Sequence, residues 1–326
     1  MYGGRVSDLL RELLAEREYL VADGATGTNL MGMGLPPGQA PDLWNLDEPQ
    51  NVSRLHESFL EVGADIILTN TFGANRCRLA MEKAESRTQE INEAGARLAC
   101  SARDSAGRRV VVAGSMGPTG EIMEPLGPLT PERAEEVFSE QAGALVRGGV
   151  DVLWIETFYG FGELKAAVAA AARTGLPVLV TMTFDANGHT MMGDSPEEAA
   201  GFIQTLPVEP VAYGANCGVG PATLVEAVLG LGRGAKDGDV IIAKGNCGIP
   251  ERVDGELVFQ GDEDIMASYA QLARDAGARI IGGCCGTSPG HLAAIVESLS
   301  GYIPGSPPDA AAIGEALGPI DLHRGK

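Results

Sequence analysis

Short apolar segments alternate with longer segments of mixed polarity along most of the chain. The apolar segments are rich in Val and Ile and lack the polar–apolar alternation of a half-exposed strand, so they are typical of parallel strands buried on both faces. Eight such segments occur, at residues 19–23, 65–70, 109–114, 151–157, 177–184, 211–217, 239–247 and 279–285. The pattern therefore predicts eight parallel strands.

The segments between the strands carry helix signals. Thr130, Ser195 and Ser288 each precede a proline, which places a capping hydroxyl before a residue favoured at the first helical position. Helices are predicted within 76–105 and over 51–62, 131–148, 161–174, 196–205, 220–231, 262–276 and 289–299. Eight strand–helix units without a linker predict a single (β/α)8 TIM barrel with its active site at the C-terminal ends of the strands. An open doubly wound sheet is the alternative.

The remaining segments fit one domain over residues 1–326. We expect a barrel core at about 15–300 and a C-terminal tail at 301–326 that lies over the surface. Residues 251–260 contain Asp254-Gly255 between short extended pieces, which predicts a small hairpin after the seventh strand.

Charge narrows the possible partners. The 326 residues hold 24 Lys plus Arg and 44 Asp plus Glu, a net charge of −20. Such a chain binds nucleic acid and anionic membranes poorly, so neither is expected as a partner. The first 20 residues are typical of an amphipathic helix rather than a signal peptide, and no run of 18 apolar residues exists. A cytoplasmic, reducing location is expected.

Three of the six cysteines lie at predicted strand ends. Cys217 ends the sixth strand, and Cys284 and Cys285 end the eighth, two positions further round a barrel. Three thiolates with an open fourth position form a zinc site suited to catalysis. Neighbouring residues of an extended strand point to opposite faces, so the adjacent pair can share a metal only if the backbone curls. Three glycines could allow this: Gly282, Gly283 and Gly286.

Other interpretations of the cysteines remain open. A buried cysteine is more often a small apolar residue than a ligand, which is what we expect of Cys77 and Cys100. Cys247 at the end of the seventh strand is a less favoured ligand, and its role is open. Asn246 or a substrate could complete the metal site. The four histidines show no HxxxH or HExxH spacing, so a histidine metal site is disfavoured.

The motifs DGATGTNL, GADIILTNTFGANR, GSMGPTG, WIETF, GANCGVGP and GGCCGTSPGHL occur in this order. Together they resemble the homocysteine S-methyltransferase family, and the similarity is closest to the homocysteine-binding module of cobalamin-dependent methionine synthase. The resemblance extends from about residue 15 to 300. The betaine-dependent branch of the family carries a Tyr in the stretch that reads TNTFGAN here.

The resemblance implies a (β/α)8 barrel with zinc on Cys217, Cys284 and Cys285, and the homocysteine thiol at the open position. It also implies that Asn246 is a replaceable oxygen ligand when substrate is absent. Substrate-binding positions of the family match six further residues: Asp23, Gly24, Ala25, Ser115, Glu156 and Asn216.

The resemblance assigns roles to some of these positions. Glu156 would hold the substrate ammonium, and backbone N–H groups near Gly24 and Ala25 would meet its carboxylate. Without the resemblance, solvated acids at strand ends are the alternative for Asp23 and Glu156.

The implied activity is zinc-dependent S-methylation of homocysteine to methionine. Large methionine synthases carry folate and cobalamin modules, and no second domain or corrinoid-binding His motif is visible here, so we expect an externally supplied methyl donor. The donor could be a separate methyl-corrinoid protein or a sulfonium or betaine-like compound, and the loops with Met116, Met123, Met191 and Met192 could face it. A second hypothesis is methyl transfer to homocysteine or another thiol from a specialised donor in a demethylation pathway, and a non-catalytic partner subunit with structural zinc is a third. A homo-oligomer remains open.

Overall fold

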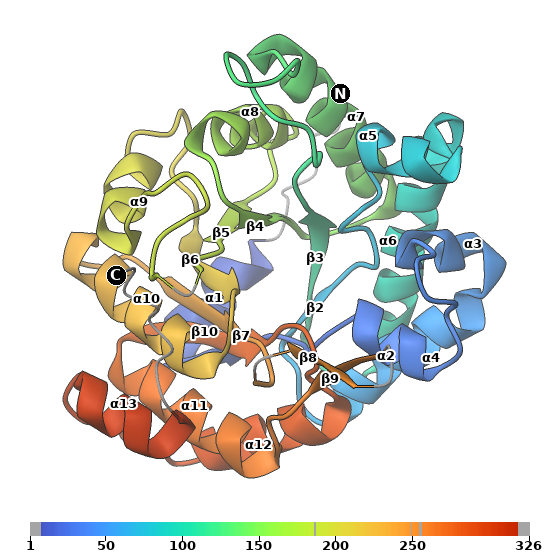
Figure 1. The fold of residues 1–326 in the computed structure, drawn as a ribbon. Coiled ribbons are helices and arrows are strands. Elements are labelled where there is room, and N and C mark those ends of the chain that lie inside the picture. The colour runs from blue at the N-terminus through green and yellow to red at the C-terminus, as the bar shows by residue number, and fades with distance from the viewer. Residues whose placement is uncertain (1–7, 186, 249, 254–255, 319–326) are drawn as a thin grey trace.

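The computed structural model describes residues 8–185, 187–248, 250–253 and 256–318. Eight parallel strands form the central sheet in the order β1-β10-β7-β6-β5-β4-β3-β2, and a parallel bridge between Ala22 and Ile66 brings β1 beside β2 (Figure 1). The predicted TIM barrel is therefore confirmed. The barrel strands are β1 (Leu20–Val21), β2 (Ile66–Leu68), β3 (Val111–Met116), β4 (Val152–Phe158), β5 (Val178–Met182), β6 (Ala212–Cys217), β7 (Ile241–Gly245) and β10 (Ala278–Gly283).

Each predicted helix after a strand is present, with one difference. The region 76–105 is not continuous: it contains α5 (Arg76–Leu79), two 3-10 turns and α6 (Thr88–Ser105), and the left-handed backbone of Lys83 ends the first turn. The other helices are α1 (Leu9–Glu16), α2 (Gly27–Gly32), α3 (Trp44–Asp47), α4 (Pro49–Glu61), α7 (Pro131–Gly148), α8 (Phe161–Ala172), α9 (Pro196–Ile203), α10 (Pro221–Gly234), α11 (Glu263–Asp275), α12 (Pro289–Leu299) and α13 (Ala310–Leu317).

The hairpin predicted after the seventh strand is also present. β8 (Pro250–Val253) pairs antiparallel with β9 (Glu256–Phe259). The predicted turn at 254–255 lies outside the described residues.

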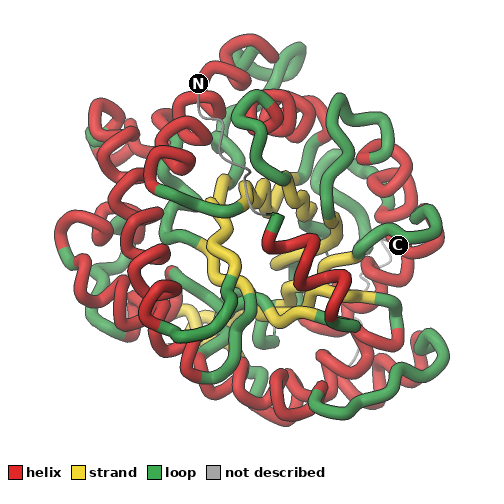
Figure 2. Tube along the Cα trace, turned by 180° about the vertical axis from the view of Figure 1, so that it is seen from behind, coloured by secondary structure: helices red, strands yellow, loops and turns green. Residues whose placement is uncertain are grey.

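The amphipathic helix α1 closes one end of the barrel. Figure 2 shows it crossing the barrel opening on the side away from the viewer of Figure 1. Its buried face, formed by Leu10, Leu13 and Leu14, packs against the apolar side chains that fill the barrel interior, including Leu20 and Ile280. Because α1 precedes β1, it covers the N-terminal ends of the strands and leaves the C-terminal ends accessible.

The described part of the C-terminal tail is docked on the barrel. α13 contacts α10 and α11, and its Ile313 is fully buried. Apolar burial of this kind stabilises the docked position. Within the described part of the chain, no helix is both long enough and apolar enough to cross a bilayer.

Candidate metal centre and substrate site

Three thiols meet at the C-terminal end of the barrel. β7 lies between β6 and β10, and its Gly245 is the register partner of both Cys217 and Gly283. Cys217 and the residues after Gly283 therefore lie at one level. The Sγ atoms of Cys217, Cys284 and Cys285 all lie within 4.8 Å of one another, and those of Cys217 and Cys285 are 4.0 Å apart. We call these residues the cysteine triad.

The backbone curls at both cysteine segments. Cys217 has a φ of 62° and Gly218 of 78°, so the chain turns as β6 ends. Gly286, with a φ of 80°, supplies the turn after Cys284 and Cys285, as expected.

Gly282 and Gly283 serve a different purpose from the one expected, because neither has a positive φ. A Cβ at Gly282 would lie 2.6 Å from the Ala22 carbonyl oxygen, and one at Gly283 would lie 2.2 Å from Cγ2 of Thr287. These two glycines allow close packing of the strand end.

The triad fits a zinc ion. Zn–S bonds of about 2.3 Å in a tetrahedral arrangement require sulfur atoms about 3.8 Å apart, close to the 4.0 Å between Cys217 and Cys285. Hydrogen bonds from Cys284 and Cys285 lower the pKa of the Cys217 thiol, whereas the hydrogen bonds that they make to Cys217, and to a lesser extent its charge, raise the pKa values of the other two. Without a metal the cluster therefore holds one thiolate, Cys217, and resists ionisation of the other two thiols, whereas a bound divalent cation would compensate the charge of further thiolates.

Asn246 connects the two cysteine segments. Its Oδ1 accepts a hydrogen bond from the Cys285 N–H at 3.0 Å, and its Nδ2 donates to the Gly218 carbonyl at 2.7 Å. In this structure the side chain bridges the segments that carry the triad. Its use as a replaceable oxygen ligand remains a prediction.

Glu156 lies at a bulge of β4. The register with β5 shifts between Ile155 and Phe158, and Thr157 has a φ of 64°. Asn216 supports this bulge, since its Oδ1 accepts from the Thr157 N–H at 2.9 Å and its Nδ2 donates to Thr157 Oγ1 at 2.7 Å. Bulges next to active sites commonly re-aim a side chain.

The Glu156 carboxyl is buried and poised to change charge near neutrality. Ser115 Oγ donates to its Oε1 in a short hydrogen bond, and Nδ2 of Asn216 lies 3.5 Å from its Oε2. Burial raises the pKa of Glu156 to about 7, although nearby Lys244 opposes the increase. A buried carboxylate that lacks a full counter-charge is suited to receive a cation such as an ammonium group.

The raised pKa predicts a pH-dependent stability. Relative to an ordinary value of about 4.3, the folded protein favours protonated Glu156, so this stabilisation is complete below about pH 4 and is lost as the pH rises through 7. Between pH 5 and 8 the metal-free protein should lose about 2–3 kcal/mol of unfolding free energy from this group. Urea unfolding of the wild type and of Glu156→Gln at each pH measures it. Equal pH dependence in both proteins would contradict the assignment.

Sequence reasoning missed Lys244, which lies beneath the site. This lysine of β7 is buried, and its Nζ lies 2.7 Å from Oδ1 of Asp23 and 5.6 Å from the centre of the Trp154 ring. Oδ2 of Asp23 accepts from the Leu68 N–H at 2.7 Å. Both carboxylate oxygens of Asp23 are thus engaged by the protein. A lone lysine inside an apolar strand was the available signal, because an unpaired buried charge is costly.

Of the two backbone N–H groups expected to meet the substrate carboxylate, one already donates a hydrogen bond within the protein. The Ala25 N–H already donates to the Thr287 carbonyl at 3.0 Å, whereas the Gly24 N–H has no acceptor among the described residues. A Cβ at Gly24 would lie 2.7 Å from that carbonyl oxygen and 2.8 Å from the Phe59 ring, so no larger residue fits here. Of these two N–H groups, that of Gly24 is therefore the one we expect to bind the substrate carboxylate.

The other candidate residues separate clearly. Cys100 and Cys247 are buried and Cys77 is half-buried, and none of them belongs to the triad. Met116 is fully buried, which contradicts the expectation that it faces a donor, because its side chain packs in the apolar core outside β3. Met191 and Met192 are exposed.

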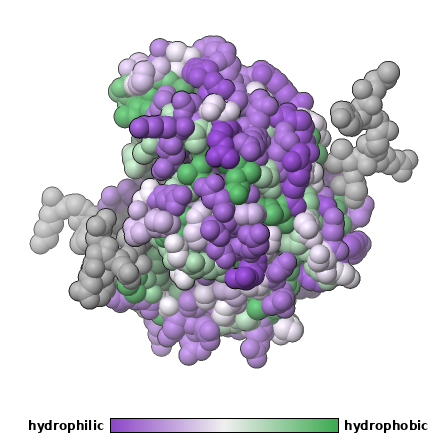
Figure 3. All heavy atoms as spheres, turned by 90° about the vertical axis from the view of Figure 1, so that its right-hand side faces the viewer, coloured by the Kyte–Doolittle hydropathy of each residue, from purple (hydrophilic) through white to green (hydrophobic). Residues whose placement is uncertain are grey.

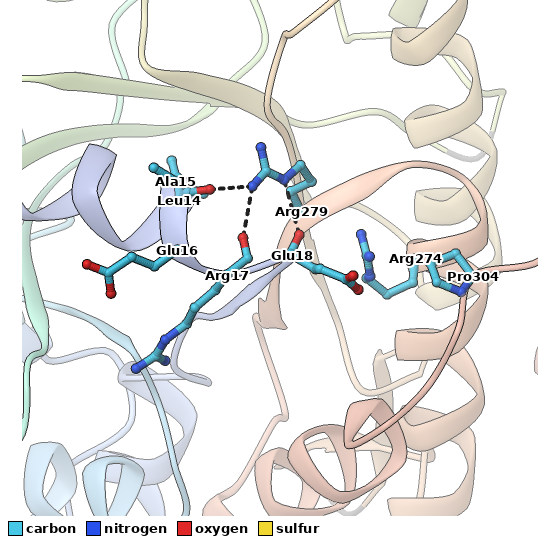
Figure 4. A pocket seen from close by; sticks show the side chains of 8 residues that line it. All are labelled: Leu14, Ala15, Glu16, Arg17, Glu18, Arg274, Arg279 and Pro304. Carbon is cyan, nitrogen blue, oxygen red and sulfur yellow. Dashed lines mark hydrogen bonds between the residues drawn. The ribbon is translucent and has the colours of Figure 1, made fainter.

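A surface hollow at the opposite end of the barrel is lined by the end of α1 and by Arg274, Arg279 and Pro304. Figure 4 shows its arginines near the end of α1. Arg279 donates to the carbonyls of Leu14, Arg17 and Glu18, and Arg274 donates to the carbonyl of Ala278. The bonds from Arg279 hold the end of α1 against β10, and the bond from Arg274 joins α11 to β10. These arginines have a structural role, and the cysteine end remains the candidate site.

The chain is similar in sequence to two methionine synthases. The methionine synthases of Mycobacterium tuberculosis (strain ATCC 25618 / H37Rv) and Mycobacterium leprae (strain TN) are each 29% identical to this chain, over 90% and 91% of its length. The matches cover 25% and 26% of those proteins, so the chain spans about a quarter of their length.

A solved structure shows the same fold. The metallated form of the homocysteine methyltransferase MmuM from Escherichia coli superposes with a TM-score of 0.74 and 24% identity, over 88% of this chain and 98% of that one. The homocysteine S-methyltransferase family matches residues 20–299. Because this match covers most of the sequence, the chain belongs to the homocysteine S-methyltransferase family.

Proposed function

We propose that this protein is a zinc-dependent methyltransferase that converts homocysteine to methionine with a methyl donor supplied from outside the barrel. The observation that carries the proposal is the cysteine triad, whose three sulfur atoms lie within 4.8 Å of one another at the C-terminal end of the barrel. Active sites of TIM-barrel enzymes lie at this end. Membership of the methyltransferase family supports the reaction class.

Cys217, Cys284 and Cys285 would hold the zinc, which lowers the pKa of a bound thiol and so supplies a nucleophilic thiolate at neutral pH. An alkyl thiol in water, with a pKa of about 8.5, is only a few per cent ionised at pH 7. With three protein ligands, the substrate sulfur would be free to serve as the fourth.

Other residues of the chain would bind and orient the amino acid part of the substrate. Ionised Glu156 would receive the ammonium group, with Ser115 and Asn216 holding its carboxylate in place. The Gly24 N–H would donate to the substrate carboxylate. Asp23 would not contact the substrate, because its two carboxylate oxygens already accept hydrogen bonds from Leu68 and Lys244. Its role would be to neutralise Lys244 beneath the site.

The surface around the barrel mouth favours a large donor. Figure 3 shows the molecule from the right-hand side of Figure 1, where a flank of the barrel carries apolar patches among hydrophilic side chains. Of the exposed large apolar side chains in the described residues, most follow the C-terminal end of a barrel strand: Met31, Met33, Met81, Ile122, Leu126, Met191, Met192 and Val258. Exposed apolar side chains at this end of the barrel would suit contact with a protein surface, so we place a methyl-corrinoid protein ahead of a small sulfonium or betaine-like compound as donor.

A donor assay tests the function. Zinc-loaded protein is incubated with labelled homocysteine and, separately, with methylcobalamin, a methylated corrinoid protein, S-methylmethionine, dimethylsulfoniopropionate or betaine. We expect labelled methionine with a corrinoid donor and none from zinc-stripped protein. Methionine formed only from a small sulfonium compound or betaine would show that the donor is a small molecule and not a corrinoid. No methionine from any donor would contradict the proposed activity.

A further inference from the structure

Cys247 lies beside the cysteine triad without belonging to it. Its backbone N–H donates to the Cys285 carbonyl at 2.9 Å, and its carbonyl accepts from the Gly261 N–H at 3.1 Å. The residue before it, Asn246, bonds to the Cys285 N–H. The segment after β7 and the turn after β10 are thus joined by two hydrogen bonds around Cys285.

The Cys247 side chain reaches a third segment. Its Sγ lies 3.1 Å from the Gly261 carbonyl oxygen and 3.4 Å from Nε2 of His291, which belongs to the first turn of α12. Nδ1 of His291 accepts from the Ser288 N–H at 3.0 Å. Cys247 therefore connects the segment after β7 with α12, the helix that follows the turn carrying Cys284 and Cys285.

The hydrogen bonds that link Ser288, His291, Cys247 and Gly261 can all form at once, because each has one donor and one acceptor. A backbone N–H can only donate, so Nδ1 of His291 carries no proton and Nε2 carries it in the neutral ring. Nε2 then donates to Sγ of Cys247, whose own proton goes to the Gly261 carbonyl. Burial lowers the pKa of His291, which favours this neutral form.

The packing around Cys247 leaves little room for movement. A Cβ at Gly261 would lie 2.9 Å from Sγ of Cys247 and 2.7 Å from its carbonyl carbon. A Cβ at Gly286, in the triad turn, would lie 2.4 Å from the Phe259 ring. Close contacts on both sides transmit a shift of one segment to the next.

We propose that the Cys247–His291 contact is a positioning device for the metal centre: it holds the Asn246–Cys247 segment against the Cys284–Cys285 turn and so keeps the three triad sulfur atoms at metal-binding separation. This inference rests on the proposed metal site. Neither residue touches the metal or substrate, so both act through Asn246 and Cys285. Outer partners of metal ligands typically change metal affinity by about 10–100-fold when they are removed.

The test measures zinc retention in three variants. Cys247→Ala removes one partner of the contact. His291→Asn keeps a short acceptor for the Ser288 N–H, and so the helix cap, but has no atom that reaches Cys247. Cys100→Ala is the matched control, because Cys100 is also buried and donates to a glycine carbonyl, that of Gly149, at 3.1 Å. Zinc-loaded proteins are mixed with a chromophoric chelator, and the release rate, zinc affinity and thermal midpoint are recorded.

We expect Cys247→Ala and His291→Asn to release zinc about 10–100-fold faster than the wild type and Cys100→Ala to release it at the wild-type rate. The double variant should resemble the single variants, since each breaks the same contact. If Cys247→Ala and His291→Asn retained zinc as well as Cys100→Ala does, at a similar loss of thermal stability, the positioning role would be wrong but the proposed function would stand. A wild type that retains no zinc would overturn the proposed function as well.

Discussion

Replacing Cys217 by serine should abolish both zinc retention and methyl transfer while leaving the barrel folded. The variant removes one of three sulfur ligands, and a serine hydroxyl stays protonated at neutral pH and binds zinc poorly. The zinc dissociation constant should rise by more than ~100-fold, which is the upper end of the effect of removing a residue that only contacts a metal ligand. Metal content after dialysis against a chelator, together with labelled methionine formation, measures the effect.

Cys77→Ser is the control for this experiment, because Cys77 is a half-buried thiol on α5 outside the triad. It should retain zinc and activity. Circular dichroism and thermal midpoints of the metal-free proteins report the fold. A Cys217→Ser protein that keeps zinc would contradict the ligand assignment, whereas one that unfolds on losing zinc would favour a structural role for the metal.

Replacing Lys244 by methionine should destabilise the protein strongly. The Lys244 and Asp23 side chains are 3% and 1% exposed, and their charged atoms are 2.7 Å apart. Without the lysine, the Asp23 carboxylate is buried without a counter-charge, which typically costs about 3–5 kcal/mol of unfolding free energy. Urea unfolding at neutral pH measures the loss.

A double variant separates the ion pair from packing. In Asp23→Asn/Lys244→Met neither member of this ion pair remains as an unpaired buried charge, and the Asn oxygen can still accept from the Leu68 N–H. The double variant should therefore be more stable than the two single losses predict, by about 2–3 kcal/mol. Strictly additive losses would show that the two side chains do not stabilise each other.

The secondary structure was predictable where its signals are local. The caps expected at Thr130, Ser195 and Ser288 are all present, each accepting from a backbone N–H of the first helical turn. The break at Lys83 was not predicted, because a left-handed residue other than glycine leaves no strong mark in the sequence.

That the two cysteine segments lie close together was predictable because it depends on the topology of the barrel. Once eight strands close into a barrel, the ends of β6 and β10 flank β7, and side chains at those ends approach one another. The detailed shape of the cysteine triad was not predictable. The turn at Cys217 and the bulge at Thr157 require positive φ values in residues that rarely adopt them.

The sequence by itself determined the strands, the helices, the barrel and the residues able to hold a metal, since apolar periodicity and helix caps act over a few neighbouring positions. Only the tertiary structure decided which groups pair across the barrel. It joined Lys244 to Asp23, Cys247 to His291 and Asn246 to the Cys285 N–H. The physical reason is that these contacts depend on strand register and barrel closure, which fix distances of a few ångströms between residues far apart in the chain.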